Sequence, residues 1–203
     1  MKQKIIGLTG FARSGKDSFY KIASEILKEE YNLKSMRYAL ADALKADTKN
    51  FIYDKVGLDV YTDNPDEKSI FRPLLVAYGK CKRVQSKGTY WTSLLQNKIE
   101  LDTESDVVFV TDIRYAEYEQ DEVQWIKNVM GGDLIHITKY EEDGFGGKLY
   151  IKPPNDDEAK NDPVIRSHAD ALFQWRHSLD AGGVMDTEYM KSVVRPLLQK
   201  IMN

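Results

Sequence analysis

The residues with the clearest chemistry form a glycine-rich run near the start of the chain. The run follows the pattern G-x-x-x-x-G-K and reads Gly10-Phe11-Ala12-Arg13-Ser14-Gly15-Lys16-Asp17-Ser18. Its glycines allow the backbone to turn N–H groups inward around a phosphate, and the helix that follows adds the positive end of its dipole. Lys16 supplies a mobile cation for the terminal phosphates of a nucleoside triphosphate. The run therefore predicts a triphosphate-binding loop formed by Gly10, Arg13, Ser14, Gly15, Lys16, Asp17 and Ser18.

Asp17 stands where this pattern usually has a serine or threonine, whose hydroxyl would ligate Mg²⁺. The carboxylate of Asp17 can instead hold the metal directly or through a water molecule. Ser18 is a second candidate, although it lies one residue further round the helix. The alternative interpretation is that Asp17 only complements the positive N-terminus of the helix.

A second acid follows the most apolar strand of the chain. The run 107–111 is apolar and rich in β-branched residues, and Asp112 comes directly after it. Enzymes with such a loop place a second carboxylate near the metal at this point, so we expect Asp17 and Asp112 to be the metal ligands. Arg114 follows at the same edge, and we expect it to bind phosphate. A cap of the strand end and a surface ion pair are the respective alternatives.

Several cations occur where they could line a cleft beside the loop. They are Lys45, Arg72, Arg83, Arg114 and Arg166. Phosphoryl transfer between two anions requires their repulsion to be neutralised, and guanidinium groups do this with paired hydrogen bonds. When the acceptor is itself a phosphate, positioning and electrostatics suffice without a general base. We expect Lys16, Arg114 and Arg166 to be catalytic, with Arg166 stabilising the transferring group.

The aromatic residues leave two interpretations open. Tyr78 and Trp91 are candidates to stack on an acceptor base, with packing in a core or an interface as the alternative. The segment 67–101 likewise has enough apolar surface for a dimer interface or for a core, so a homodimer is one expectation.

Short β-like runs alternate with longer helical ones along the chain. The runs typical of strands are 5–9, 35–40, 107–111, 134–138 and 169–175, and those typical of helices are 18–30, 42–53, 67–82, 89–101, 117–130 and 187–202. This alternation indicates an α/β sandwich with a mostly parallel sheet. Right-handed connections place the carboxyl ends of the strands along one edge, where ligands bind. The polar segment 140–167 is too long for an ordinary connection, and we expect a lid there.

Composition excludes several classes of protein. The chain has 203 residues, which favours a single domain, and one cysteine, Cys81, which excludes a disulfide within the chain. A net charge of −3 argues against a nucleic-acid-binding surface. No run of 18 apolar residues is present, and we expect no membrane span and a cytoplasmic location.

Four elements together resemble bacteriophage-type deoxynucleoside monophosphate kinases. The first is the loop itself, with Arg13-Ser14-Gly15-Lys16-Asp17. The others are Ala39-Leu40-Ala41-Asp42-Ala43-Leu44-Lys45, then Arg72-Pro73-Leu74-Leu75-Val76-Ala77-Tyr78-Gly79 followed by Tyr90-Trp91, and Val110-Thr111-Asp112-Ile113-Arg114-Tyr115. They occur in the order of that family between about residues 5 and 130.

The resemblance implies transfer of the γ-phosphate of ATP to a deoxynucleoside 5′-monophosphate, with Mg²⁺ as cofactor, in the host cytoplasm if the chain is phage-encoded. It implies an α/β P-loop kinase fold, a three-layer sandwich with a five-stranded parallel sheet, a helical acceptor-binding insertion and a lid. The ranges would be a core of 1–45, 102–140 and 168–203, an insertion at about 46–101 and a lid at about 141–167. The implied acceptor site comprises Asp42, Lys45, Arg72, Tyr78, Arg83, Trp91, Asp112 and Arg114, among which Lys45, Arg72 and Arg114 would hold the acceptor phosphate.

Three other functions stay open. A P-loop kinase of another metabolite, similar to dephospho-coenzyme A or phosphomevalonate kinases, would transfer the phosphate to a hydroxyl and would need a base, for which Asp42 is the candidate. A non-catalytic module would bind ATP through the same loop without turning it over. A DNA-binding protein is disfavoured by the net charge.

Overall fold

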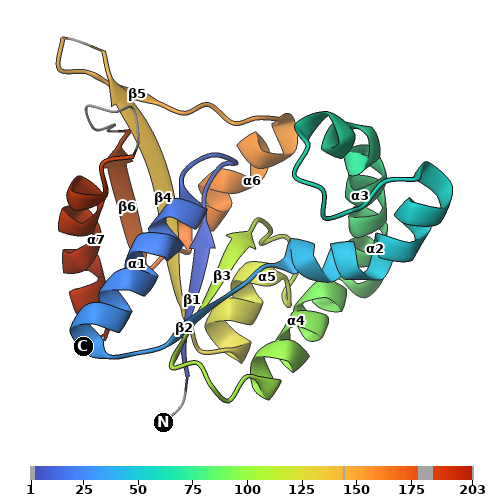
Figure 1. Cartoon of the computed structure of the whole chain (residues 1–203), viewed down its shortest axis with the longest axis horizontal. Helices are drawn as coiled ribbons and strands as arrows, with labels where there is room; N and C mark the ends of the chain where they lie inside the picture. The colour runs from blue at the N-terminus through green and yellow to red at the C-terminus, as the bar shows by residue number, and fades with distance from the viewer. Residues whose placement is uncertain (1–2, 144, 178–184, 203) are drawn as a thin grey trace.

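A six-stranded sheet forms the centre of the molecule (Figure 1). The computed structural model describes residues 3–143, 145–177 and 185–202, so Gly144 of the expected lid and 178–184 of the expected core lie outside the described residues. The strands are β1 (Lys4–Thr9), β2 (Ser35–Tyr38), β3 (Val107–Ile113), β4 (Asp133–Glu142), β5 (Lys148–Tyr150) and β6 (Ala171–Arg176). Five of them are parallel, in the order β2-β3-β1-β4-β6, which confirms the predicted five-stranded parallel sheet. β5 adds an antiparallel strand to the end of β4.

Helices cover both faces of this sheet, as Figure 1 shows. α1 (Lys16–Tyr31) and α7 (Thr187–Met202) pack together on one face. The other face carries α4 (Thr89–Leu101), α5 (Glu122–Gln124), the π-helix η1 (Trp125–Val129) and α6 (Asp156–Ser167). The predicted α/β three-layer sandwich is confirmed.

β3 shows why its sequence is apolar without alternation. Val107 and Phe109 belong to the core beneath α1 and α7, whereas Val108 and Val110 belong to the core on the opposite face. Successive side chains of a strand point to opposite faces, so a strand covered on both sides buries every residue. The run therefore marks the interior of the sheet and fixes where Asp112, which comes next, must lie.

A helical lobe projects from the sheet between β2 and β3 (Figure 1). It consists of α2 (Leu40–Val56) and α3 (Pro65–Ser86), and it leads into α4. A small core of its own, formed by Ile52, Val60 and Phe71, holds α2 against α3. The expected helices 42–53, 67–82 and 89–101 are confirmed, with α2 and α3 longer than the patterns indicated.

Two segments have a different secondary structure from the one that the sequence suggested. The helix expected at 117–130 begins only at Glu122, because the carboxylate of Asp121 accepts the N–H of Glu122 and ends the loop that precedes it. The segment 140–167 is not an irregular loop. β4 continues to Glu142 and forms a hairpin with β5, and α6 follows with Asn155 as its N-cap.

Candidate active site

The phosphate loop joins β1 to α1 and owes its shape to three residues with positive φ. These are Gly10, Arg13 and Gly15, with φ of 124°, 67° and 93°. A Cβ on Gly10 would collide with the carbonyl oxygen of Ile137, and one on Gly15 would collide with the ring of Trp175. Only glycine fits these two positions, because both the backbone angle and the space exclude a side chain. The pattern of the sequence thus reflects a real steric requirement.

The N-terminus of α1 opens into this loop. Gly15 is its N-cap, and no described side chain caps it. The first N–H groups of a helix have no partner within the helix and carry the positive end of its dipole. They form the kind of anion site that a glycine-rich loop presents to a phosphate.

The amino group of Lys16 lies over the same loop. It donates to the carbonyl oxygens of Gly10 at 2.8 Å and Phe11 at 2.7 Å. Burial, followed by the nearby charge of Arg114, lowers the pKa of Lys16 from 10.5 to about 8. A phosphate at the loop would favour the charged form and raise this pKa again. Lys16 thus lies at the loop that the sequence pattern indicated.

A carboxylate from α6 occupies groups that a phosphate would use. Glu158 accepts the backbone N–H of Ala12 through Oε2 at 2.8 Å, and its Oε1 accepts from Nη1 of Arg114 at 3.0 Å. The side chain of Glu158 is mostly buried, whereas that of Arg114 is half-exposed. One negative group thus bridges the phosphate loop and the arginine at the end of β3, and it holds α6 over both.

Asp112 has a different role from the one expected. Its Oδ1 accepts the N–H of Leu40 and its Oδ2 accepts that of Ala41, both at 2.8 Å. It therefore caps the N-terminus of α2, and burial raises its pKa despite these hydrogen bonds. Both oxygens are engaged by the backbone of α2, a role that the sequence did not indicate, and metal binding by Asp112 stays a prediction.

Asp17 fits a metal better than Asp112 does. Its carboxylate is 82% exposed at the mouth of the loop and lies 3.3 Å from Nε of Arg37. In the described ranges, no group of three or more His, Cys, Asp or Glu side chains is arranged to hold a metal on its own. Mg²⁺ in phosphotransfer sites commonly takes one or two carboxylates together with substrate phosphates and water. Asp17 suits that mode of binding.

Arg37 of β2 connects Asp17 to the expected acceptor site. Its Nη1 lies 3.5 Å from Oδ2 of Asp42, which is in the first turn of α2. The guanidinium therefore bridges the phosphate loop and α2. Asp42 stays half-exposed.

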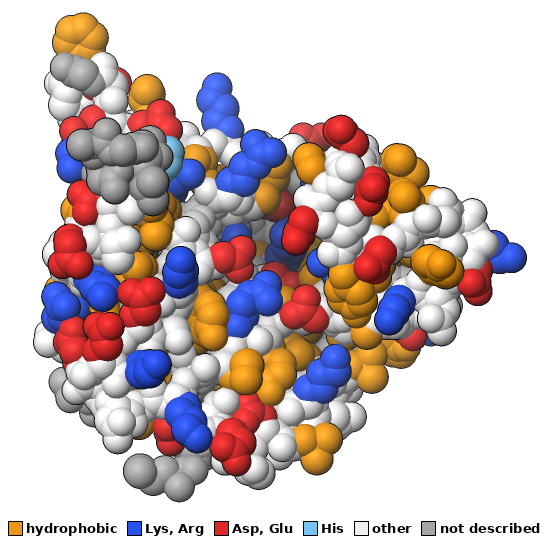
Figure 2. Space-filling model, in the orientation of Figure 1, with side chains coloured by type: hydrophobic (Ala, Val, Ile, Leu, Met, Phe, Trp, Pro, Cys, Tyr) orange, Lys and Arg blue, Asp and Glu red, His pale blue; other side chains and the backbone are white. Residues whose placement is uncertain are grey.

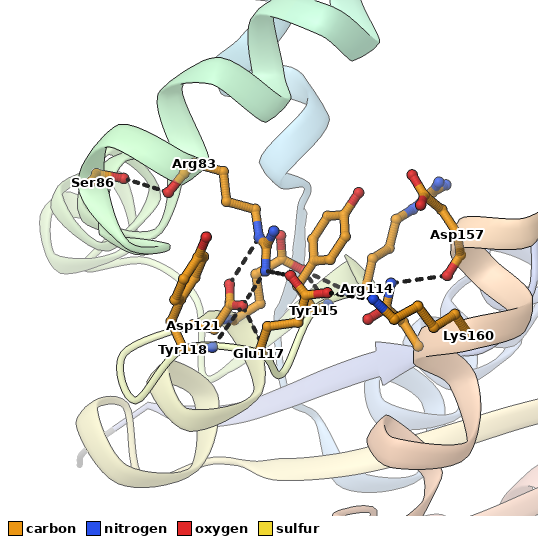
Figure 3. Close-up of polar contacts among 11 residues, drawn as sticks. Arg83, Ser86, Arg114, Tyr115, Glu117, Tyr118, Asp121, Asp157 and Lys160 are labelled. Atoms are coloured by element: carbon orange, nitrogen blue, oxygen red, sulfur yellow. Dashed lines mark hydrogen bonds and ion pairs between the residues drawn. The ribbon is translucent and has the colours of Figure 1, made fainter.

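Arg83 is held in a buried ion pair, as Figure 3 shows. Its guanidinium points from α3 into loop 114–121, where it contacts Asp121 and lies 2.9 Å from Oε2 of Glu117. The rings of Tyr115 and Tyr118 lie 3.8 and 4.9 Å from its central carbon. These contacts hold Arg83 on the loop, and it lines neither of the two cavities described below, so the structure gives no support to its expected contact with an acceptor phosphate.

Two buried acids complete the support of this loop. Asp121 accepts the N–H groups of Glu117 and Tyr118 in addition to its bonds with Arg83. Glu122 accepts the N–H of Arg114 at 2.6 Å. Burial raises the pKa of Glu122 from 4.5 to about 8, so a largely neutral acid fixes the backbone from which the Arg114 side chain extends.

Two cavities flank the Lys16–Arg114 edge. One, of about 440 Å³, lies between α3, the start of loop 114–121 and α6, and is lined by Val76, Arg114, Tyr115, Asn155, Asp156, Asp157, Glu158 and Asn161. The other, of about 310 Å³, lies beside the phosphate loop and is lined by Arg13, Gly15, Lys16, Asp17, Ser18, Lys139, Trp175, His177 and Met185. Both volumes are in the range of small-molecule sites. Figure 2 shows Lys and Arg side chains around a hollow between the sheet and the helical lobe.

The remaining acceptor candidates are divided by the structure. Arg72 is exposed one turn before Val76 on α3, so it lies on the cavity side, and it forms no ion pair with the described residues. The Lys45 amino group lies 5.9 Å from the ring of Tyr61 in the helical lobe. Tyr78 donates to Asp47, and Trp91 is buried with its Nε1 bound to Gly79, so packing, and not base stacking, accounts for Trp91.

Arg166 is not brought to the loop. It lies in the last turn of α6, eight residues after Glu158, which is about 12 Å along a helix axis. That end of α6 adjoins the start of β4, where the backbone N–H of Asp170 donates to the carbonyl of Leu134. The expectation that Arg166 stabilises the transferring group therefore has no support in this geometry.

Sequence reasoning missed several residues of the site, chiefly Glu158, Arg37, Glu122 and Trp175. Asn155, three residues before Glu158, is a capping pattern that could have revealed α6. Trp175 ends a predicted strand at the ligand edge, and its Nε1 donates to the carbonyl of Ser14 at 2.9 Å. For Arg37 and Glu122, no local signal distinguishes them from ordinary surface charges.

Comparisons with known proteins give little further detail. No protein-family model matches the sequence, and no curated protein matches it. Among solved structures, the shikimate kinase from Acinetobacter baumannii in complex with shikimate is similar, with a TM-score of 0.44 and 14% sequence identity over 98% of this chain and 93% of that chain. In the described part of the chain, no helix has the length and apolar character to cross a membrane. The site geometry therefore carries the functional argument.

Proposed function

We propose that this protein is an ATP-dependent phosphotransferase that phosphorylates a deoxynucleoside 5′-monophosphate. One observation carries the proposal: Glu158 joins the phosphate loop to Arg114, and Lys16 and Arg114 each line one of the two cavities at this edge. A donor triphosphate could bind in the cavity beside the phosphate loop, and an acceptor could bind in the cavity between α3, loop 114–121 and α6. Both would then present their phosphates to Lys16 and Arg114. Such an arrangement suits transfer between two anions.

The residues then have distinct tasks. The N-terminus of α1 and Lys16 bind the β- and γ-phosphates, and Asp17 would hold Mg²⁺, which supplies charge neutralisation when bound. Arg114 neutralises charge on the transferring and acceptor phosphates. Arg72 and Val76 lie on the side of α3 that faces the acceptor cavity.

α6 is the part that must move, and it forms the lid of this proposal together with the β4–β5 hairpin. Glu158 holds the N–H of Ala12 and the guanidinium of Arg114. Arriving phosphates would replace it at both, and α6 would settle in a new position over the substrates. Closure of this kind excludes water and prevents wasteful hydrolysis of the triphosphate.

The choice of acceptor rests on the resemblance of four sequence elements to deoxynucleoside monophosphate kinases. A coupled assay of ADP release with ATP, Mg²⁺ and a panel of ribo- and deoxynucleoside monophosphates tests it. We expect ADP release that depends on a deoxynucleoside monophosphate. Release that no nucleotide stimulates would contradict the proposal.

A kinase with a hydroxyl acceptor is the second candidate, because the half-exposed carboxylate of Asp42 is available as a base. For a hydroxyl acceptor, Asp42→Asn should lower kcat by about 10²-fold or more, the usual size of a general-base contribution. For a nucleotide acceptor, Arg72→Met should cost more than Asp42→Asn, mainly in KM. Asp54→Asn, on the exposed side of the same helix, is the matched control.

A further inference from the structure

α3 carries an apolar stripe that faces solvent. Its members recur at intervals of four, three, four and three residues, and they are Ile70, Leu74, Ala77, Cys81 and Val84. All five are exposed, and the exposed fractions of Ile70, Leu74 and Val84 are 60%, 45% and 51%. We call these five residues the α3 stripe.

The α3 stripe is not the side of the helix that holds the lobe together. Phe71 and Leu75 pack in the small core with α2, and Gly79 abuts Leu44. A helix with a period of 3.6 residues places the stripe well away from that row. α3 is therefore apolar on a second side, and residues scattered singly over a surface would not show this spacing.

The 4-3-4-3 spacing is the spacing by which one helix packs along another. Apolar residues that repeat every 3.5 residues form a continuous seam, whereas a flat or irregular partner needs no such repeat. α3 has 22 residues and is about 33 Å long, enough for the five positions to contact a partner helix. The occupant that fits the stripe is a second α-helix.

The order of residues in the stripe is self-complementary about Ala77. When two copies of α3 run antiparallel and cross at this residue, Ile70 faces Val84, Leu74 faces Cys81, and Ala77 faces Ala77. Large residues thus meet medium or small ones, and the smallest side chains meet at the crossing point. A twofold axis requires such an arrangement, in which the same surface serves both partners.

The charged residues of α3 also favour antiparallel pairing. Asp66 and Glu67 lie in its first turn, and Lys80 and Lys87 lie near its end. Antiparallel pairing brings Asp66 of one copy close to Lys87 of the other and aligns the two helix dipoles favourably. A parallel pair would place like charges together at both ends.

We infer that α3 pairs with α3 of a second copy of this chain, antiparallel about Ala77, to form a homodimer. The interface lies on the side of the lobe away from the core of α2 and α3, and hydrophobic side chains gather on this lobe in Figure 2. A single helix seam buries less surface than a standard interface of about 1,200–2,000 Å². The dimer is accordingly weak, with a Kd of about micromolar size.

Sedimentation equilibrium over a range of concentrations tests the surface. The wild-type chain is expected to dimerise, and Leu74→Lys and Val84→Lys are each expected to raise Kd by about tenfold or more, because a charge replaces a seam residue. Val129→Lys is the matched control, since Val129 is 55% exposed but lies on η1. Circular dichroism verifies that each variant is folded. A wild-type chain that stays monomeric, or a control that weakens association as much as Leu74→Lys, would overturn the inference.

Cysteine crosslinking tests the direction of the pairing. In the antiparallel pair, each Cys81 lies four residues from the crossing point, so the two are about 12 Å apart along the axis and cannot form a disulfide. Mild oxidation should therefore leave the wild-type chain uncrosslinked and should crosslink Ala77→Cys/Cys81→Ser. The reverse result, a disulfide through Cys81 and none through position 77, would show a parallel pair and overturn the inference.

A charge exchange sharpens the result. Asp66→Lys should weaken association a few-fold, and the double variant Asp66→Lys/Lys87→Asp should restore it, because the opposed ends again carry opposite charges. A double variant that associates no better than Asp66→Lys alone would contradict the antiparallel arrangement. None of these measurements depends on phosphotransfer, so they stand apart from the test of the proposed function.

Discussion

The phosphate loop and loop 114–121 lie at the same edge of the sheet but are held by different means. The phosphate loop is shaped by its own backbone, with positive φ at Gly10 and Gly15, and Lys16 bonds back to carbonyls five and six residues earlier. Loop 114–121 is instead held by Arg83 of α3, which lies 38 residues before Asp121 in the sequence. The first loop is shaped mainly by its own backbone, with Trp175 and Glu158 in contact with it, whereas the second depends on a distant helix.

This difference predicts whether a mutation affects catalysis or the stability of the fold. A change in the phosphate loop should alter chemistry and leave the fold in place. A change in the support of loop 114–121 should alter stability first and chemistry only as a consequence. Four predictions test this contrast.

Replacing Arg83 should have the largest effect on stability. Arg83→Met leaves Asp121 as a buried charge without its partner, which costs about 3–5 kcal/mol of unfolding free energy. Urea denaturation measures the loss. Lys160→Met is the control, because Lys160 pairs with the same Glu117 but is 78% exposed, and a surface pair of this kind contributes less than about 1 kcal/mol. Equal losses in the two variants would show that loop 114–121 is not held through Arg83.

Replacing Lys16 should abolish most activity without loss of stability. Lys16→Ala removes a cation that acts on the transferring phosphate, and kcat should fall by about 10²–10³-fold, the cost of removing one group that stabilises the transition state. The ADP-release assay and a thermal melt measure the two effects. Lys28→Ala, at the exposed end of the same helix, should leave both unchanged. Retained turnover in Lys16→Ala would mean that the phosphate loop is not the donor site.

Glu122 should make stability depend on pH. Because burial raises its pKa from 4.5 to about 8, the folded chain binds more protons than the unfolded chain in this window. The contribution of Glu122 to stability therefore falls as pH rises from 4.5 to about 8. Glu122→Gln keeps an acceptor for the N–H of Arg114 and should remove this part of the slope in urea titrations at several pH values. An identical slope in the variant would place the titration elsewhere.

Releasing Glu158 should have the smallest effect. Glu158→Gln weakens the contacts with Ala12 and Arg114 that compete with phosphate, so the affinity for ATP should rise by about fivefold, or roughly 1 kcal/mol for a charge-assisted hydrogen bond. Isothermal titration calorimetry measures it. Asp156→Asn, a neighbouring acid that lines the same cavity, should change affinity less. Weaker binding in Glu158→Gln would show that the carboxylate supports the bound state.

The sequence predicted the features that are determined by neighbouring residues along the chain. The spacing of Gly10, Gly15 and Lys16 indicated the phosphate loop, and the apolar run before Asp112 indicated a central strand at the correct edge. Both signals arise because backbone sterics and two-sided burial constrain neighbouring residues directly.

The sequence did not predict what depends on pairing across the fold. In the sequence, nothing distinguishes Arg83 from Arg114, and both resemble ordinary surface arginines. In the structure, Arg83 is buried against Asp121, whereas Arg114 lines a cavity. The cap that Asp112 forms on α2 was missed, because its partners are backbone N–H groups, which every residue except proline has. Glu158 was overlooked because α6 was not recognised.

In the proposed enzyme, the bridging carboxylate of Glu158 would also decide which anions can bind at the loop. Glu158 is part of the chain, so it competes with incoming anions for the same donors at a high effective concentration. This concentration does not depend on the composition of the solution. A small anion such as inorganic phosphate must displace it with the contacts of one group. A triphosphate displaces it with several groups spread along α1, Lys16 and Arg114. The loop of the proposed enzyme would thus be shielded from simple anions such as inorganic phosphate and would remain open to a triphosphate.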